Sequence, residues 1–472
     1  MKRITIDPVT RIEGHAKITI QLDDAGEVVS AQFHVTQVRG FEKFVEGRPF
    51  YEMPGITARI CGICPVSHLL ASAKACDAIM AVRIPPAGAL LRELIHCAQF
   101  VQSHALSFFH LSAPDLLLGM DSDPAARNVL GLAAQRPELA RDGIALRQFG
   151  QRIIEAVAGE KVHPSGIVPG GVNRPLEGAV REEILRGLPA AKAIAARTLE
   201  MYKNALDGFE DEIAHFGSAP TMYAGLVGPD GAFRIYDGVI RFRNADGSIA
   251  ADGVAGEQYA DFIGERSVTD SYMKAPYYKP LGSREGVYRV GPLARLNVAD
   301  RFGTPLADAE LIEYRRRYGP LVSGAFHYHY ARLIELVYAL ERIGELLGMP
   351  EILNSRTRAR AEVNALEGVG IAEAPRGLLI HHYKVNEQGG IVWANLIVAT
   401  GHNNLAIGRA VEQTAKRYIR GNAMEEGMLN RVSAVVRAYD PCLSCSTHAG
   451  GLLALRIQLI GVRGEVLDEV AT

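Results

Sequence analysis

The sequence lacks any hydrophobic run long enough to cross a lipid bilayer, which takes about 18 consecutive apolar residues. The longest candidate, residues 391–400, is about half that length and predicts a buried strand or a short core segment. The first residues, MKRITIDPVTRIEGH, also lack the apolar stretch and the small-residue cleavage site of a signal peptide. We therefore expect a cytoplasmic protein, unless a partner subunit carries an export signal for both chains.

The chain has little excess charge of either sign. Its 51 Lys and Arg residues against 53 Asp and Glu residues leave a net charge of −2. This balance provides no overall basic field to bind nucleic acid, and it indicates no acidic tail. Hydrophobic residues make up 48% and charged residues 22% of the 472 positions, which excludes disorder as the main state of the chain.

Cysteine is scarce, with six residues in the whole chain, which excludes a disulfide scaffold and indicates a reducing compartment. Four of the six form two C-x-x-C pairs, Cys61 with Cys64 and Cys442 with Cys445. Pairs of this kind in a cytoplasmic chain favour metal or redox chemistry. The other two cysteines stand alone and are expected in the core.

Hydrophobic periodicity predicts an α+β fold that is mainly α. Residues 2–37 alternate between apolar and polar, which predicts an N-terminal β-hairpin region with its turn at the segment DDAG. Helices are expected within residues 56–158, 177–216, 308–348 and 404–438, and strands within residues 217–310 and 375–402. With no internal repeat and no flexible linker, the chain is expected to form one composite domain rather than several separate ones.

The two cysteine pairs are the strongest sign of chemistry in the sequence. Two cysteines three positions apart can bind one cation from a single turn of chain once they are deprotonated. Here about 380 residues separate the pairs, whereas zinc modules place their ligand pairs within a few tens of residues. Spacing alone leaves open a structural zinc site, two unrelated pairs, and a site for nickel, copper or iron.

The residues around these pairs resemble the large subunit of nickel–iron hydrogenases. R-x-C-G-x-C-x-x-x-H spans residues 59–68, and D-P-C-x-x-C-x-x-H spans residues 440–448. Further motifs of the family occur in order: Arg11-Ile-Glu-Gly-His15, Arg39-Gly-Phe-Glu42, Ser103-His104 through His110 to Asp115, Gly170-Gly171 and Ala374-Pro-Arg-Gly377. These segments are most similar to those of the soluble bidirectional, NAD-linked group. The resemblance implies the fold of that family, a central bundle of long helices with peripheral β-hairpins and sheets.

The resemblance implies a nickel–iron centre that oxidises H2 reversibly and heterolytically to protons and electrons. In the family all four thiolates bind nickel, which assigns Cys61, Cys64, Cys442 and Cys445 as nickel ligands. The second cysteine of each pair also bridges to iron, which assigns Cys64 and Cys445 as iron ligands. The iron of the family carries carbon monoxide and cyanide.

The resemblance also implies catalytic groups beside the metals. Arg376 is expected over the open face of the centre with Asp115 paired to it, and a terminal thiolate such as Cys442, or the arginine, is expected as the base. Glu13 matches the glutamate that relays protons near Cys442. The alternative for Glu13 is a simple ion pair with a neighbouring arginine on a strand.

Supporting positions are implied in the same way. Glu42, His448 and the backbone carbonyl of Leu396 match a site that usually holds magnesium, although a histidine ligand is unusual for so hard a cation. His68, one turn after the first cysteine pair, is expected to hydrogen-bond to a cysteine sulfur rather than to bind metal. Thr400 matches a position whose hydroxyl can hydrogen-bond to a cyanide on iron.

Residues 449–472 extend beyond the motif at which the mature chain of the family ends. We expect a precursor that a dedicated endopeptidase cuts between His448 and Ala449, after nickel-insertion proteins have loaded the metal. A tail that keeps the C-terminal cysteine pair outside would leave the site open for loading.

Electrons must leave through other subunits. Once four cysteines hold the centre, two remain, and a [4Fe–4S] cluster needs four. The segment Gly368-Val-Gly370 lacks the third glycine of a dinucleotide fingerprint, so the chain is not expected to bind NAD itself. A small iron–sulfur subunit is therefore expected, and the resemblance implies diaphorase subunits with FMN and NAD.

Other interpretations remain open at this point. The alternatives are a deazaflavin-linked or sulfur-linked hydrogenase, a metal-free relative in a quinone-reducing complex, and a structural zinc protein. Retention of all four cysteines argues against the metal-free relative.

Overall fold

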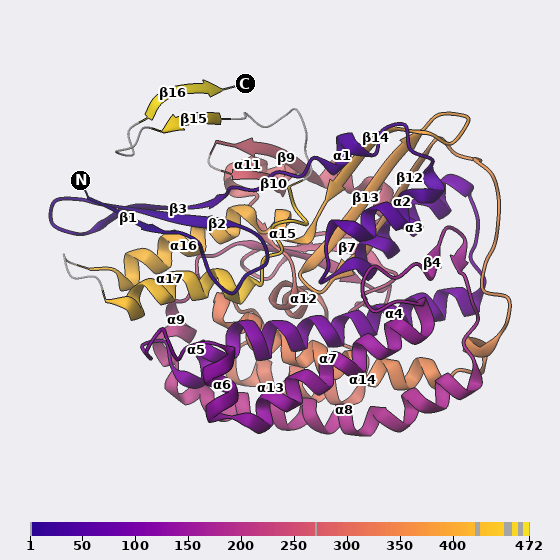
Figure 1. Ribbon diagram of the computed structural model, residues 1–472, viewed down its shortest axis with the longest axis horizontal. Coiled ribbons are helices and arrows are strands. Elements are labelled where there is room, and N and C mark those ends of the chain that lie inside the picture. The colour runs from indigo at the N-terminus through magenta and orange to yellow at the C-terminus, as the bar shows by residue number, and fades with distance from the viewer. Residues whose placement is uncertain (1, 270, 421–424, 448–455, 461–465, 472) are drawn as a thin grey trace.

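The computed structural model describes residues 2–269, 271–420 and 425–447, together with two C-terminal strands (Figure 1). Long helices lie side by side along the lower part of Figure 1, and small sheets and short helices cover their upper side. Among the described residues, no helix is both long and apolar enough to cross a membrane.

The centre of the molecule is built from long helices: α3 (Pro65–Met80), α4 (Pro86–Ala105), α7 (Pro137–Ala158), α8 (Gly178–Ala205) and α14 (Tyr328–Gly348). Helix α4 packs against α7 and α14, and α14 packs against α8. Proline stands in the first turn of α3, α4 and α7, where its missing N–H costs no hydrogen bond. Helix α14 buries 17 of its 21 residues, which places it in the middle of the bundle.

Shorter helices surround this bundle. They are α1 (Phe41–Phe44), α2 (Met53–Thr57), α5 (Ala113–Leu118), α6 (Val129–Gln135), α9 (Glu210–His215), α10 (Tyr259–Phe262), α11 (Gly282–Glu285), α12 (Pro292–Val298), α13 (Pro305–Tyr318), α15 (Ala399–His402), α16 (Asn404–Tyr418) and α17 (Glu426–Tyr439). A π-helical stretch, Leu106–Ser112, joins α4 to α5, and such stretches are frequent at functional sites.

The strands form several small sheets. The N-terminal sheet has the antiparallel order β1 (Lys2–Ile6), β2 (Ala16–Leu22), β3 (Val28–Val35), and a second antiparallel sheet joins β12 (Glu367–Ala374), β13 (Gly377–Val385) and β14 (Ile391–Ile397). A four-stranded sheet has the order β11 (Tyr288–Arg289), β6 (Met222–Val227), β7 (Val239–Arg243), β8 (Ile249–Val254), with β11 parallel to β6. The remaining pairs are β4 (Ile167–Val168) with β5 (Gly171–Val172), β9 (Ile263–Val268) with β10 (Ser271–Tyr278), and β15 (Arg456–Ile460) with β16 (Val466–Ala471).

Helix α3 packs directly on strand β12. A Cβ atom added at Gly370 would lie 2.0 Å from the carbonyl oxygen of Ala71, so a side chain at this position would push the helix away. Gly368 approaches α3 in the same way. The two glycines therefore bring strand and helix together, and the tight turn that ends β12 presents Pro375 and Arg376 to the interior.

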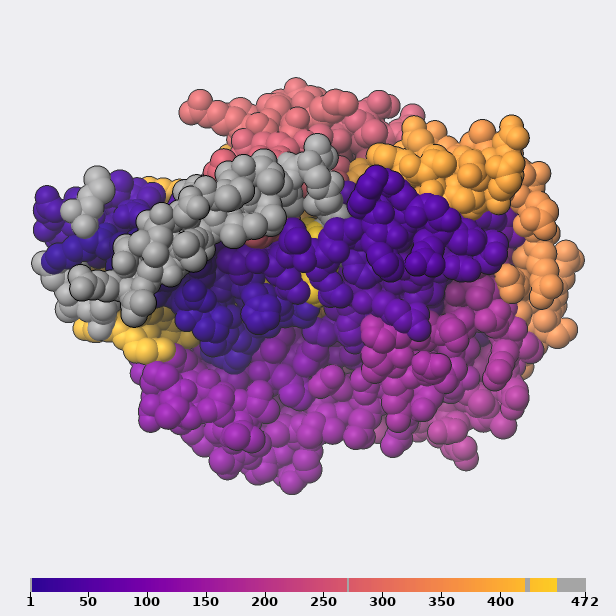
Figure 2. Space-filling view, turned by 45° about the horizontal axis from the view of Figure 1, so that its top comes forward, coloured from indigo at the N-terminus to yellow at the C-terminus, as the bar shows by residue number. Residues whose placement is uncertain are grey.

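The N-terminal strands lie beside the helices α16 and α17 (Figure 1). Helix α16 packs against strand β3. Figure 2 shows the indigo surface of the N-terminal strands next to the yellow surface of the C-terminal helices. This arrangement brings the N-terminal segment close to the loop that follows α17.

Most of the predicted elements are confirmed, including the N-terminal hairpin as β2 and β3 and the buried strand at β14. The helix predicted over residues 308–348 is interrupted, because Gly319 has φ 94° and Pro320 follows it. The helix predicted over residues 404–438 is also divided, since α16 ends at Tyr418 and α17 begins at Glu426. The class, mainly helical with several small sheets, agrees with the prediction.

Candidate metal centre

The four cysteines of the two C-x-x-C pairs converge on one point. The Sγ atom of Cys61 lies 3.3 Å from that of Cys442, and the Sγ atom of Cys64 lies 3.5 Å from that of Cys445. The sulfurs of Cys442 and Cys445 are 2.7 Å apart. All four sulfurs lie within 4.8 Å of one another, and all four residues are buried. The structure thus brings together the four ligands that the motifs predicted.

Each pair lies at the end of a helix. Cys64 directly precedes α3, and Cys61 has extended backbone just before it. Cys442 and Cys445 follow α17. The residue directly after this helix, Asp440, has φ 53°. A left-handed residue at this position stops the helix and turns the next few residues back toward the core. Both pairs therefore come from short, turned segments that present their thiols inward.

The four thiols influence one another's ionisation. Burial raises the pKa of Cys442 and of Cys445 well above the ordinary thiol value. Hydrogen bonds from Cys442, Cys445 and Cys61 lower the pKa of Cys64. A bound cation is needed before all four can be thiolates together, so metal binding here releases protons. Four soft sulfur donors suit nickel, iron, zinc or copper(I).

Arg376 lies beside the thiols and is itself buried. Its Nε donates to the carbonyl oxygen of Asp440 at 2.7 Å, and its Nη2 lies 3.0 Å from the Asp440 carboxylate. Its Nη1 donates to Ser103 Oγ at 3.2 Å. Burial lowers the pKa of Arg376, but the charges of Asp440 and of Cys442 and Cys64 outweigh that effect and raise the pKa. Arg376 is therefore a fixed positive charge beside the four sulfurs.

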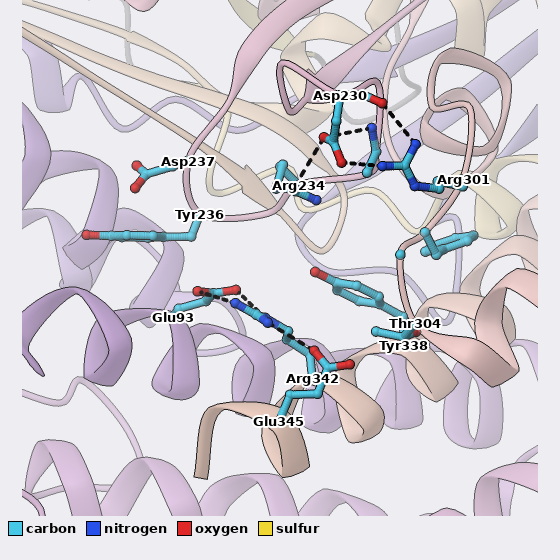
Figure 3. A pocket seen from close by; sticks show the side chains of 13 residues that line it. Glu93, Asp230, Arg234, Tyr236, Asp237, Arg301, Thr304, Tyr338, Arg342 and Glu345 are labelled. Atoms are coloured by element: carbon cyan, nitrogen blue, oxygen red, sulfur yellow. Dashed lines mark hydrogen bonds and ion pairs between the residues drawn. The ribbon is translucent and has the colours of Figure 1, made fainter. Parts of the chain in front are cut away.

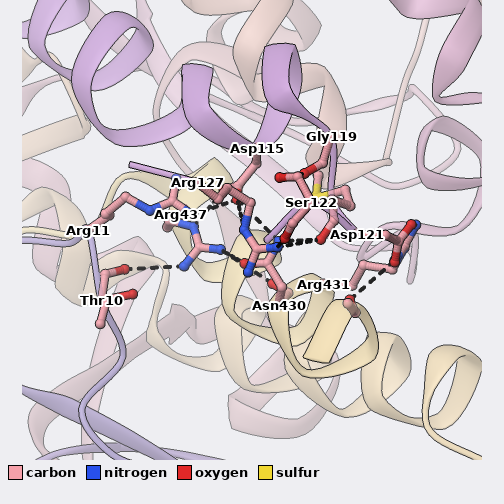
Figure 4. Close-up of polar contacts among 12 residues, drawn as sticks. Thr10, Arg11, Asp115, Gly119, Asp121, Ser122, Arg127, Asn430, Arg431 and Arg437 are labelled. Carbon is pink, nitrogen blue, oxygen red and sulfur yellow. Dashed lines mark hydrogen bonds and ion pairs between the residues drawn. The ribbon is translucent and has the colours of Figure 1, made fainter. Parts of the chain in front are cut away.

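The predicted pairing of Arg376 with Asp115 is wrong. Asp115 instead accepts hydrogen bonds from Arg11 Nη2 at 2.5 Å and from Arg437 Nε at 2.9 Å (Figure 4). The partner of Arg376 is Asp440, which the sequence analysis did not single out. Asp440 is the first residue of the D-P-C motif, two positions before Cys442. This position could have indicated the pairing, because a carboxylate so close to a cysteine can bind a cationic side chain beside the thiols.

Asp115 joins three parts of the chain. Arg11 belongs to the N-terminal segment, Asp115 to α5 and Arg437 to α17. Arg127 lies 3.5 Å away, and Asn430 Nδ2 also donates to the carboxylate at 3.1 Å. Burial alone would raise the pKa of Asp115, but the positive charges of Arg437 and Arg11 lower it overall. Asp115 is thus a buried carboxylate that anchors three segments around the centre.

Glu13 reaches the loop of the C-terminal cysteines. Its backbone N–H donates to the Pro441 carbonyl at 3.4 Å, and the Leu443 N–H donates to the Glu13 carbonyl at 3.1 Å. The Glu13 carboxylate accepts the Ser444 N–H at 3.1 Å and also the Ser444 hydroxyl. The alternative pairing with Arg11 is not found, since Arg11 binds Asp115. Glu13 is therefore a polar group in direct contact with the cysteine loop.

Two of the three residues predicted to hold magnesium come together. Glu42 Oε1 accepts the Leu396 N–H at 2.9 Å and lies 3.0 Å from the Lys274 ammonium. Burial raises the pKa of Glu42, and the Lys274 charge partly opposes this. The third residue, His448, lies outside the described residues, as does Ala449 of the expected cleavage site. Lys274 was not predicted, because two of the groups around it, Glu42 on α1 and Asn395 on β14, lie far from it in sequence.

His68 and Thr400 both contact the cysteines. A hydrogen bond from His68 contributes to the lowered pKa of Cys64, and Thr400 Oγ1 accepts the Cys442 N–H at 2.8 Å. His68 Nδ1 in turn lies 3.2 Å from His381 Nε2. His381 lies on β13, and its local sequence pattern gives no sign of this contact.

A separate cavity of about 360 Å³ lies between α4, α14 and the segment that follows β6 (Figure 3). Its charged groups pair with one another: Arg342 Nε lies 2.7 Å from Glu93, and Asp230 binds Arg301 and Arg234. None of the residues that line this cavity is a cysteine or a predicted site residue. Among the described residues, the four thiols form the one group of three or more His, Cys, Asp or Glu side chains placed to hold a metal ion.

Four buried thiols from both ends of one mainly helical chain form a candidate metal site unlike a zinc module, whose ligand pairs lie close in sequence. Comparison with known families agrees. The nickel-dependent hydrogenase profile matches residues 39–137 and 241–448, and a HoxL-like profile matches residues 3–38. The chain belongs to the nickel-dependent hydrogenase family, and it is an enzyme subunit of that class.

Individual relatives show the same family. The chain is 41% identical to the NAD-reducing hydrogenase HoxS subunit beta of Cupriavidus necator, over 100% of this chain and 99% of that protein. It is 31% identical to the sulfhydrogenase 2 subunit alpha of Pyrococcus furiosus, over 94% of this chain and 98% of that protein. A crystal structure of an NAD+-reducing [NiFe]-hydrogenase in the H2-reduced state matches with a TM-score of 0.92 and 44% identity, covering 95% of this chain and 100% of that one. The resemblance inferred from the motifs is confirmed.

Proposed function

We propose that this chain is the catalytic subunit of a nickel–iron hydrogenase that oxidises H2 reversibly to protons and electrons and passes the electrons to NAD+ through partner subunits. The observation that carries the proposal is the convergence of four buried thiols, contributed by both ends of the chain, on one point. The full-length similarity to an NAD-reducing hydrogenase supports the choice of acceptor.

The four cysteines are the proposed metal ligands. Cys61, Cys64, Cys442 and Cys445 hold nickel, and Cys64 and Cys445 also hold an iron that carries carbon monoxide and cyanide. When bound, this pair of metals supplies the polarisation that splits H2 heterolytically. The protein excludes water from the centre, because all four cysteines are buried.

Other side chains manage charge and protons. Arg376 holds a fixed positive charge over the sulfurs, and Asp440 fixes its orientation with two hydrogen bonds. The Cys442 sulfur accepts the proton, and Glu13 carries it away along the contact with Ser444. Asp115 acts at a distance, as the anchor of the segments that hold Glu13 and the cysteine loop.

The electrons leave toward a small iron–sulfur subunit. The two remaining cysteines, Cys76 and Cys97, are fully buried and too few for a [4Fe–4S] cluster. An open cavity of about 750 Å³ lies beside the first cysteine pair, where Arg39 Nη1 donates to the carbonyl oxygen of Ile60 at 3.0 Å. Phe44, 57% exposed, lies at its edge. We assign this surface to the small subunit, and diaphorase subunits with FMN and NAD complete the route.

Charge reversal tests this surface. Arg48 lines the cavity, and Arg48→Glu should reduce the amount of small subunit that co-purifies with the chain. Arg284, which is exposed on α11 away from this cavity, is the matched control, and Arg284→Glu should leave co-purification unchanged. Equal effects of both variants would show that the small subunit docks elsewhere.

A magnesium ion is proposed at Glu42, the Leu396 carbonyl and His448. Glu42 supplies a carboxylate oxygen of the kind that magnesium prefers, and because this oxygen also lies 3.0 Å from the Lys274 ammonium, the ion would share the carboxylate with Lys274. The ion would fix the last residue of the cysteine motif to the sheet that carries β14.

Residues 449–472 are proposed to be a C-terminal extension that an endopeptidase removes after nickel insertion, leaving residues 1–448 as the catalytic domain. The hydrogenase family match ends at residue 448, and the solved NAD+-reducing enzyme covers 95% of this chain. In a His448→Ala variant the chain should keep its full mass in intact-protein mass spectrometry and should not oxidise H2. Normal H2 uptake by an uncut chain would contradict this assignment.

The decisive experiment is infrared spectroscopy on the purified complex together with metal analysis. We expect cyanide and carbonyl bands, about one nickel and one iron per chain, and NAD+ reduction by H2. Zinc alone would indicate a structural site, and no metal would indicate a relative of quinone-reducing complexes. If the metals and the infrared bands are found but the complex reduces a deazaflavin or sulfur and not NAD+, the proposed metal centre would stand and the proposed electron acceptor would be wrong.

A further inference from the structure

We propose that Arg295 is a positioning residue for H2 oxidation, which acts by fixing the turn that carries Arg376. This inference rests on the role proposed for Arg376 above. Arg295 lies in α12, is fully buried, and donates no hydrogen bond to the cysteines or to any other proposed metal ligand. Its influence on the centre must therefore pass through its partners.

Every N–H group of the Arg295 guanidinium has an acceptor. Nε and Nη2 each donate to Glu335 at 2.7 Å, and Nη1 donates to Glu373 at 2.7 Å. The two remaining N–H groups donate at 2.9 Å to the carbonyl oxygens of Ala374 and Pro375. A guanidinium has five N–H groups in a rigid plane, so these five bonds fix the position of both carbonyls.

The two carbonyls directly precede Arg376 in the chain. The orientation of these two peptide groups fixes the position of the Arg376 backbone. The turn is short, because Ala374 at the end of β12 pairs with Gly377 at the start of β13. The start of helix α12 also packs against the turn. A Cβ atom added at Gly291, the residue directly before α12, would lie 2.7 Å from the Arg376 carbonyl oxygen. The turn therefore rests on α12 at two points, one of which is the Arg295 side chain.

The partners of Arg295 also reach the other end of Arg376. Glu335 accepts a hydrogen bond from His104 Nε2 at 2.8 Å, and His104 follows Ser103, which accepts from Arg376 Nη1. Phe100 lies against the Arg295 guanidinium, with 5.4 Å between the cation and the ring centroid. One buried ion cluster thus holds both the backbone of Arg376 and the helix that contacts its side chain.

A buried ion cluster can also serve stability alone, so the test must separate the two roles. If Arg295 acts through Arg376, replacing the Arg295 guanidinium in an enzyme that already lacks the Arg376 guanidinium should cause no further loss of activity. If the cluster only stabilises the fold, the two losses should multiply. We therefore compare Arg295→Lys, Arg376→Lys and the double variant in the complete complex.

We expect Arg295→Lys to lower kcat for H2 oxidation by about 100-fold, the size of effect that a misplacement of about 1 Å produces. Nickel and iron contents should stay normal, the infrared bands of cyanide and carbonyl should shift, and amide hydrogen exchange should accelerate at residues 374–378. The double variant should be as active as Arg376→Lys alone. Arg92→Lys is the matched control, because Arg92 is equally buried, binds Asp77 and the Gly171 carbonyl, and should leave activity and infrared bands unchanged.

Wild-type activity in Arg295→Lys, or multiplied losses in the double variant, would overturn the proposal. Wild-type activity in Arg376→Lys would instead show that the role assigned to Arg376 is wrong. If Arg295→Lys does not assemble, Glu373→Gln replaces it in the same comparison, since this change keeps the shape of the side chain and removes one of the two charges that hold Arg295.

Discussion

Gly14 allows the N-terminal segment to lie against the cysteine loop. It has φ 87°, and a Cβ atom added to it would lie 2.8 Å from Cβ of Leu443. Leu443 stands between the two cysteines of the C-terminal pair. A side chain at Gly14 would therefore be strained in its own backbone and would also push on the loop that presents two ligands.

We expect Gly14→Ala to lower the free energy of unfolding by about 1–3 kcal/mol and to reduce nickel retention. Gly47→Ala is the matched control, because Gly47 has a similar φ of 82° and open space around its Cβ position. Gly47→Ala should lower the free energy of unfolding by about 1 kcal/mol, because a non-glycine residue is strained at positive φ, and it should leave the nickel content unchanged. Thermal unfolding and metal analysis would measure both, and equal nickel contents would contradict the proposed fit.

Glu13 provides the second prediction for a single residue. Glu13→Gln keeps the shape of the side chain: its amide oxygen can accept the Ser444 N–H, and its NH2 group can donate to the Ser444 hydroxyl oxygen. The change removes the carboxylate that can accept and release a proton. We expect H2 oxidation to fall by about 100-fold or more, with unchanged metal content and unchanged infrared bands. Glu27→Gln, an exposed change in the turn before β3, serves as control. Full activity in Glu13→Gln would remove Glu13 from the proton path.

Individual residues also show how far the sequence alone could lead. The four cysteines, Glu13, Arg376 and Glu42 belong to motifs shared with the hydrogenase family, and this resemblance was enough to expect them in one region. Asp115 was assigned to the wrong arginine, because the choice between Arg376 and Arg437 is made by the packing of α17. Arg295 was missed because charged residues are usually exposed, and no local pattern indicates that five acceptors surround this one.

At the scale of elements, Asp115 connects α5, α17 and the N-terminal segment. Its buried carboxylate pairs with Arg11 and Arg437, whose charges would otherwise lack a carboxylate partner, and Arg127, which also pairs with Glu426, lies nearby. Helix α17 is also the element that places Asp440 and the second cysteine pair. The geometry of the centre therefore depends on an ion cluster that does not touch the sulfurs.

Asp115→Asn should lower the free energy of unfolding by about 3–5 kcal/mol, because the neutral amide leaves buried arginine charges without a partner. Asp121→Asn is the matched control in the same region. Asp121 pairs with Arg431 on α17, but its side chain is 70% exposed, so the change should cost less than about 1 kcal/mol. Denaturant unfolding of both variants measures the difference, and similar midpoints would show that Asp115 is not an anchor.

Element boundaries were less predictable than the elements themselves. The strand alternation of residues 2–37 and the apolar spacing of α14 are local signals that survive in the fold. The approach of α3 to β12 depends on Gly368 and Gly370, which in sequence resemble part of a nucleotide-binding loop. Only the packed structure shows that these glycines serve contact between helix and strand.

At the scale of the whole molecule, the interior holds histidines that stay neutral. Burial lowers the pKa to about 3 for His96, His329 and His402, and to about 4 for His104 and His327. In the unfolded chain each would have its ordinary pKa of about 6.5. The unfolded chain therefore binds more protons than the folded one between about pH 6.5 and pH 4.

Stability should fall as the pH drops below about 6.5. Each of these five histidines binds a proton in the unfolded chain but not in the folded one within this window, so each contributes a loss of up to about 1.4 kcal/mol per pH unit. Burial raises the pKa of Glu373 to about 7 and also raises the pKa values of Glu42 and Asp440, and these three carboxyl groups oppose the trend. Thermal unfolding between pH 7.5 and pH 5 should show a steep decrease of Tm, and a constant Tm would contradict it.

The distance along the chain between the two halves of the centre has a consequence for biosynthesis. The paired sulfurs of Cys61 and Cys442 are 381 positions apart. At about 5–20 residues per second, a ribosome completes the second half roughly 20 to 80 seconds after the first. A polypeptide terminated before Cys442 therefore lacks half of the sulfur donors. Only a chain translated past both C-terminal cysteines can bind the metal ions with all four ligands.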